Sequence, residues 1–203
     1  MFQRAQRRSK PRPAAIAQPA TIALLASAAR QELVDTLEAL GGTATAAELA
    51  AQLGRPVDGL YYHLARLRKG GLIEELAGRS AAGRGERRFR IVAPRGRALA
   101  LAYRPDDPRN TRAVRTVVAS MLRIARRDFD RAIARPDAVV RGPRRELWAA
   151  RGQGWLTAAE VTRANQLLHE LTELLRRPRT DKRDRLLSLC FVVAPVAARP
   201  ARR

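Results

Sequence analysis

The sequence has few residues of the kinds that build disulfides, metal sites and membrane spans. Cys190 is the single cysteine among 203 residues, so no disulfide can form within the chain. Histidine occurs only as His63 and His169, and a conventional metal site needs several soft or imidazole ligands brought together. No apolar run approaches the roughly 20 residues of a membrane span, and the first residues lack the apolar core of a signal peptide. We therefore expect a cytoplasmic protein with no metal, no cofactor and no membrane partner.

Acidic residues are also scarce. The chain has 19 Asp and Glu against 40 Lys and Arg, which gives a formal net charge of +21. Lysine contributes only Lys10, Lys69 and Lys182, and a GC-rich genome would favour arginine codons in this way. Codon bias does not explain the shortage of acids, however. A polyanionic partner does, and we place nucleic acid ahead of a membrane surface or an acidic protein.

The motifs of common enzymes are missing too. The sequence has no glycine-rich loop followed by Lys-Ser or Lys-Thr, and no glycine fingerprint after a predicted strand. Neither histidine has the context of a Ser/His/Asp or Cys/His triad. We therefore do not expect an enzyme. The length suits two modest domains, and the abundant alanine favours helix.

Three short helices are expected in succession. The first runs from Ser27 to Leu40 and ends at two glycines. The second follows in TAAELAAQLG, where Thr45 and Glu48 have the spacing of a capping box. The third opens near Pro56, because a missing N–H costs nothing at a first helical position. Its apolar residues recur at three and four positions, so they form the expected buried stripe: Val57, Leu60, Leu64 and Leu67.

A basic hairpin is expected after the third helix. Residues 72–76 and 88–92 can form two short strands, with Phe89 and Ile91 on one face and arginines on the other. Between residues 79 and 97 the single acid, Glu86, is outnumbered by seven arginines: Arg79, Arg84, Arg87, Arg88, Arg90, Arg95 and Arg97. This composition is typical of a wing that lies along a phosphate backbone.

The third helix carries the strongest indication of function, in GLYYHLARLRKGGLI. Helix, turn, helix and basic hairpin is the order of a winged helix-turn-helix, whose last helix enters the major groove, about 12 Å wide. Tyr61 and Tyr62 can offer rings to thymine methyls and hydroxyls to bases or phosphates. Arg66 can reach the backbone or a guanine edge. The alternative is that one tyrosine packs against the neighbouring helix and never touches DNA.

The second half of the chain is expected to be mostly helical. A helix predicted from Thr111 to Ala134 suits dimerisation or packing within the chain, and a further helix follows Thr157, which has capping-box spacing with Glu160. The stripe expected on the first of these helices is Val114, Val118, Met121, Ala125, Phe129 and Ile133. The run LLSLCFVVAP near the C-terminus predicts a buried strand, with its cysteine as a small buried hydrophobe.

The expected fold class is mainly α with a small β-hairpin wing: a winged helix-turn-helix followed by a mostly helical dimerisation and sensing domain. We divide the chain into a disordered basic arm (1–20), a DNA-binding domain (21–103), a helical dimerisation and possible effector domain (104–196) and a disordered tail (197–203). Trp148 and Trp155 could line an effector pocket in the third region, or could belong to its core.

These segments resemble a known family. ELAAQLG, LYYHLARLRKGGLIEE and RRFRI are similar to the ArsR-like winged helix-turn-helix transcriptional regulators of bacteria and archaea, in the branch with a Tyr-Tyr-His-Leu recognition helix. The resemblance covers residues 22–93. It implies a homodimeric DNA-binding regulator, usually a repressor, on a near-palindromic operator. Carried over by position, the DNA contacts that it implies are Asp58, Tyr61, Tyr62, Arg66, Arg84, Arg87 and Arg88.

This sequence departs from the metal-sensing members of that family, which use cysteine pairs or His/Asp clusters. We interpret His63 as a further hydrogen-bonding residue of the recognition helix. An effector would then be a small organic molecule or a partner protein.

The sequence thus predicts a homodimeric repressor that binds double-stranded DNA in the cytoplasm, associated with the nucleoid. Two alternatives stay open: an architectural protein that binds DNA without sequence preference, and a winged helix that binds an acidic protein partner. The polar, tyrosine-bearing face of the third helix favours the regulator, because an interaction module would more often expose an apolar patch there.

Overall fold

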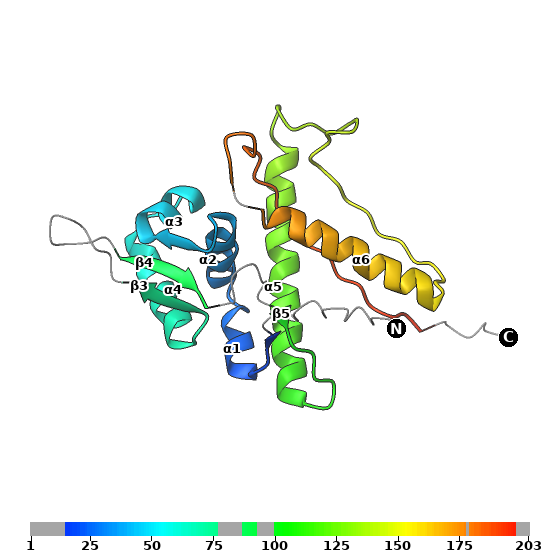
Figure 1. Cartoon of the computed structure of the whole chain (residues 1–203), viewed down its shortest axis with the longest axis horizontal. Coiled ribbons are helices and arrows are strands. Elements are labelled where there is room, and N and C mark those ends of the chain that lie inside the picture. The colour runs from blue at the N-terminus through cyan, green and yellow to red at the C-terminus, as the bar shows by residue number, and fades with distance from the viewer. Residues whose placement is uncertain (1–14, 77–86, 93–99, 178, 198–203) are drawn as a thin grey trace, which may run out of the picture.

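The computed structural model describes residues 15–76, 87–92, 100–177 and 179–197. One long helix stands between the N-terminal helices with their small sheet on one side and the last helix on the other (Figure 1). In chain order the elements are β1 (Ala15–Ile16), α1 (Pro19–Leu24), α2 (Ala28–Ala39), β2 (Thr43–Thr45), α3 (Ala46–Leu53), α4 (Asp58–Lys69), β3 (Ile73–Leu76), β4 (Arg88–Ile91), β5 (Ala100–Leu101), α5 (Pro108–Ile133) and α6 (Ala158–Leu175).

The helix-turn-helix is formed by α3 and α4, with α2 packed against both. The predicted capping box of α3 is confirmed: the Thr45 hydroxyl accepts the Glu48 N–H at 3.1 Å, and the Glu48 carboxylate accepts the Thr45 N–H at 2.7 Å. Gly54 ends α3 with a φ of +62°, in the left-handed region that favours glycine. Local signals therefore fix both ends of this helix.

A three-stranded antiparallel sheet with the order β2-β4-β3 lies beside these helices. β4 and β3 form the predicted hairpin, in which Ile73 pairs with Ile91 and Leu76 with Arg88. Phe89 and Ile91 are buried and the arginines between them are exposed, as the alternation predicted. β2 was not predicted; it adds a third strand by pairing with the other edge of β4.

One hydrophobic core joins the three helices, the sheet, α1 and the first half of α5. Its largest fully buried apolar side chains are Ile22, Leu33, Leu37, Leu49, Leu60, Leu64, Leu67, Ile73 and Val117. Burial of a leucine side chain contributes about 1.5–3 kcal/mol, so the three leucines of α4 hold the opposite face of that helix outward. Val57, expected in the same stripe, is half-buried.

The buried face of α5 differs from the predicted stripe. Its buried residues are Asn110, Ala113, Val114, Val117, Ser120 and Ile124, whereas Ile133 is exposed. The first turns of α5 pack against α1, and Asn110 is buried there because its amide donates to the Ala102 carbonyl at 3.0 Å and accepts the Arg104 N–H at 2.9 Å. Val114 of the predicted stripe is buried, and Val118 and Met121 pack against the core as partly buried residues. The prediction therefore holds over the first half of α5 and is wrong at Ile133.

The ends of the predicted regions also look different in the structure. β1 and the start of α1 fall inside the predicted arm (1–20), of which residues 1–14 lie outside the described part, as do residues 198–203 of the predicted tail. β1 pairs in parallel with β5. The hydrophobic core continues past residue 103 into the first half of α5.

The predicted buried strand in LLSLCFVVAP is wrong. Residues 186–196 form neither helix nor strand and all are exposed except Cys190, which is half-buried. A strand needs a neighbouring strand for its ladder of hydrogen bonds, and no described strand lies next to this segment. Within the described ranges, no helix is long and apolar enough to cross a membrane.

Candidate nucleic-acid interface

The exposed face of α4 holds the predicted recognition residues. Tyr61 and Tyr62 keep 47% and 65% of their surface exposed, so neither packs into the core. Asp58 and Arg66 are exposed on the same helix, as are Arg68 and Lys69 in its last turn. The helix therefore presents two aromatic rings near its start and three cations near its end.

His63 lies at the edge of this face. The residue is half-buried, and its ring meets that of Tyr62 edge to face with centroids 5.3 Å apart. Desolvation by burial lowers the pKa of His63, and the charges of Arg30 and Arg55 lower it further. Nδ1 is buried without a hydrogen-bond partner among the described residues. His63 is thus a neutral imidazole at pH 7 that helps to orient Tyr62.

Arg30 is a cation of this surface that the sequence analysis missed. Its Nε donates to the Leu24 carbonyl at 2.6 Å, which holds the side chain against the end of α1. Desolvation lowers the pKa of Arg30, and repulsion from Arg66 lowers it further. Arg30 belongs to α2, and no local pattern in that helix marks it as a neighbour of α4.

The arginines of the hairpin are held by carboxylates. Arg87 lies 3.3 Å from Glu75, and Arg68, at the end of α4, is ion-paired with the same carboxylate. Glu75 therefore links the recognition helix to the hairpin. The sequence did not predict this link, because it joins a helix to the hairpin and follows no single periodicity.

Two further ion pairs cross the sheet. Arg88 lies 3.2 Å from Glu48 of α3, and the Arg90 guanidinium contacts Glu74 through Nε at 2.7 Å. Exposed pairs of this kind contribute about 0–1 kcal/mol, so phosphates could replace these carboxylates at little cost. Arg84, the remaining predicted wing contact, lies outside the described residues.

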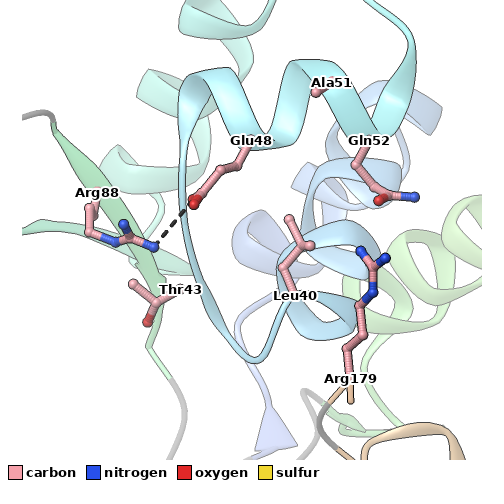
Figure 2. A pocket seen from close by; sticks show the side chains of 7 residues that line it. All are labelled: Leu40, Thr43, Glu48, Ala51, Gln52, Arg88 and Arg179. Atoms are coloured by element: carbon pink, nitrogen blue, oxygen red, sulfur yellow. Dashed lines mark hydrogen bonds and ion pairs between the residues drawn. The ribbon is translucent and has the colours of Figure 1, made fainter. Parts of the chain in front are cut away.

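A shallow hollow of about 500 Å³ opens beside α3. Figure 2 shows Glu48 and Arg88 on one side of it and Arg179 on the other. The lining residues are Leu40, Thr43, Glu48, Ala51, Gln52, Arg88 and Arg179. The predicted effector pocket near Trp148 and Trp155 is not seen in the described chain, since these side chains are 67% and 91% exposed.

Among the described residues, no group of three His, Cys, Asp or Glu side chains could hold a metal ion. The surface of α4 and the hairpin carries aromatic rings, hydroxyls and guanidinium groups.

Comparison with known proteins agrees with this geometry. Residues 25–75 match the family model of a helix-turn-helix domain. The match begins just before α2 and ends in β3, so it covers α3, α4 and the start of the hairpin. No curated protein matches the chain. The chain therefore carries a helix-turn-helix domain, the kind of domain by which proteins bind DNA.

Proposed function

We propose that this protein is a homodimeric, sequence-specific transcriptional regulator of the ArsR-like winged helix-turn-helix type, and that it represses transcription. The observation that carries the proposal is the surface of α4, where Tyr61, Tyr62 and Arg66 are exposed opposite three buried leucines. The arginine-bearing hairpin β3–β4 lies next to the end of this helix through the shared partner Glu75.

In this proposal the N-terminal half of α4 enters the major groove. The two tyrosines meet thymine methyls and base edges, with Asp58 and His63 beside them, and these contacts choose the sequence. Arg66, Arg68 and Lys69 follow towards the phosphate backbone, where contacts position the helix without reading sequence.

The hairpin is the second part of the proposed interface. Arg87 and Arg88, with Arg84 beyond the described residues, exchange their carboxylate partners for phosphates. Each neutralised phosphate releases condensed counterions, which favours binding at low salt. The Glu75 ion pairs hold hairpin and helix together before DNA arrives, so less ordering is needed on binding.

Repression follows from occupancy. Two reading heads related by a two-fold axis bind half-sites about 34–36 Å apart, one helical turn, which requires a near-palindromic operator. A dimer on such an operator blocks a promoter that overlaps it. A small organic effector or a partner protein that changes the angle between the heads would release the dimer.

Recovery and sequencing of genomic fragments bound by the purified protein, with polyanion competitor at near-physiological salt, tests this function. We expect a few strongly enriched sites that share an inverted repeat. The test variant Arg66→Ala loses a backbone contact and should lower the recovery of all fragments alike. The matched control Arg151→Ala, at an exposed arginine outside the interface, should keep both the recovery and the enrichment. Binding spread evenly over the genome would contradict the proposed regulator and favour an architectural DNA-binding protein. No binding to DNA would favour a protein-interaction module.

A further inference from the structure

The C-terminal part of the chain has no core of its own. All twenty-one buried hydrophobic residues of the described chain lie at or before Ile124. Beyond that residue, eighteen large hydrophobic side chains are exposed: Ile133, Val139, Val140, Trp148, Trp155, Leu156, Val161, Leu167, Leu171, Leu174, Leu175, Leu186, Leu187, Leu189, Phe191, Val192, Val193 and Val196. Half-exposed side chains of this size present on the order of 1,500 Å² of apolar surface, well above the few hundred Å² usual for a monomer.

The helix α6 carries an apolar stripe that forms part of this exposed surface. Its apolar residues recur at alternating spacings of three and four, the pattern of a helix that packs against a second helix. The stripe consists of Val161, Ala164, Leu168, Leu171 and Leu175. No residue of α6 is fully buried. Ala164 and Leu168 are half-buried, whereas Val161, Leu171 and Leu175 are exposed, so one copy covers the stripe only in part.

The backbone of the segment 186–196 likewise lacks partners within the described chain. It has no helix or strand, is rich in Val and Leu, and takes part in no backbone hydrogen bond with any described residue. Unpaired edges of extended apolar chain are templates for pairing with another strand. Its start is fixed, because Arg183 donates to the Leu174 carbonyl at 2.8 Å and Arg185 lies 3.4 Å from Glu146.

We propose that a second copy of this chain covers both surfaces: residues 125–197 of two copies fold into one domain, with the α6 stripes packed together and residues 186–194, which precede Pro195, paired as β-strands. The proposal specifies the interface of the homodimer in the proposed function. Its role in DNA recognition rests on that proposed function, whereas the dimer itself can be tested without DNA. The exposed apolar surface of two copies reaches the 2,000–5,000 Å² that is typical of obligate homodimers.

Two features favour a second copy over a different partner. A two-fold interface uses the same patch on both sides, and every copy carries both the stripe and the unpaired segment. The charge of α6 also favours contact between two copies at this helix. A chain of net charge +21 repels its copy. Because α6 carries three glutamates and one arginine, this repulsion is weaker there than over the rest of the chain. The domain would hold the two reading heads at a fixed separation through α5.

Sedimentation velocity of the full chain without DNA, over a range of micromolar concentrations, tests this inference. We expect a dimer that Leu171→Glu weakens roughly tenfold or more, because a charge would be buried in the interface. The matched control is Gln166→Glu on the exposed polar side of α6, which should leave the dimer intact. The core lies before residue 125, so the winged helix of each variant should keep its melting transition.

The strand pairing has its own test. Val193→Pro removes a backbone N–H and should weaken the dimer, whereas Val193→Ala keeps the N–H and should weaken it less. In the wild type, amide hydrogens of residues 186–194 should exchange slowly when the protein is dimeric and rapidly after dilution. A monomeric wild type, or a dimer that neither Leu171→Glu nor Val193→Pro affects, would overturn the inference. A dimer that enriches no genomic site would keep it and overturn the proposed regulator instead.

Discussion

Arg55 and Arg127 are bound to different oxygens of one carboxylate, that of Glu32. The Arg55 guanidinium donates to Oε2 at 2.6 Å, and Arg127 is ion-paired with Oε1. Arg55 follows α3 in the turn before the recognition helix, and Arg127 lies in α5. The Glu32 side chain is only 10% exposed. One buried carboxylate of α2 therefore ties the helix-turn-helix to the long helix that leads into the C-terminal part.

Replacement of Glu32 by glutamine should be strongly destabilising. The variant leaves two guanidinium groups without their shared counter-charge in a partly buried position, and removal of one partner from such a pair costs about 3–5 kcal/mol. We expect a loss near the lower end of that range in the free energy of urea unfolding, since both arginines remain partly exposed. The control Glu170→Gln breaks an exposed contact with Arg163 and should cost less than about 1 kcal/mol. Equal effects would contradict the role of Glu32.

Asp35, one turn further along α2, should make the protein less stable as pH rises. Loss of water around its carboxylate raises the pKa, and repulsion from Glu38, Glu32 and Asp128 raises it further, to about 7 against an ordinary 3.8. The folded state therefore keeps a proton that the unfolded state has released, and stability contributed by this group falls between pH 4 and pH 7. The Asp35 residue as a whole is exposed, although its carboxylate has lost much of its surrounding water. Solvent screening therefore makes the effect on stability small, and only its direction is predicted.

Asp35→Asn removes this titration. The variant should be more stable than the wild type at pH 7 and above, and the difference should vanish near pH 3, where both side chains are neutral. Thermal unfolding across this pH range measures it. Asp181→Asn, at an exposed turn, controls for the loss of one negative charge from a basic protein. A wild-type advantage at pH 8 would show that the Asp35 carboxylate is not destabilising.

Two glycines at the ends of the recognition segment should respond in opposite ways to alanine. Gly71, which leads from α4 into β3, has a φ of +73°, and an L residue there costs about 1–2 kcal/mol. Gly59 lies inside α4, where an added Cβ would meet nothing within 4 Å, so Gly59→Ala should stabilise by up to about 1 kcal/mol. Urea unfolding of the pair separates strain from side-chain size. The same sign for both would contradict the left-handed turn.

The elements that were predicted correctly from the sequence are those fixed by residues close together in the chain. The Thr45–Glu48 capping box lies within four residues, the leucine stripe of α4 within three turns, and the alternation of buried and exposed residues in β4 within four positions. Each of these is a contact between near neighbours or a single periodicity, so the order of helices and hairpin follows directly.

The features that were missed depend on distant segments. β2 has only three residues, and its partner β4 follows after two helices and another strand. Arg87 is ion-paired with Glu75 across the hairpin, and Glu32 is ion-paired with Arg127 on α5. The segment 186–196 failed for a different reason: apolar, β-branched composition indicates that a strand can form, but not whether this chain supplies its partner.

In the candidate site, Tyr62→Ala should relax base preference rather than abolish binding. The Tyr62 residue is 65% exposed on α4, and a mismatched base pair in a recognised site usually costs about 1–3 kcal/mol. Without the ring, this penalty should shrink at the base that the ring contacts. Selection of DNA from a randomised library by wild type and variant measures this. We expect lost preference at particular positions with similar affinity for unrelated DNA. A uniform loss for all sequences would place α4 on the backbone instead of in the groove.

Arg87→Ala combined with Arg88→Ala should have the opposite signature. Both guanidinium groups are exposed and paired only with carboxylates that phosphates can replace, so they should bind every DNA sequence equally. The plot of log affinity against log salt concentration changes by about 0.9 per phosphate contact, so the slope should flatten by roughly 2. The matched control is Arg151→Ala combined with Arg163→Ala, which removes the same charge from the C-terminal part and should leave the slope unchanged. Because net charge is identical in the two double variants, a slope that flattens equally in both would trace the salt dependence to overall charge. A slope that flattens in neither would remove the hairpin from the interface.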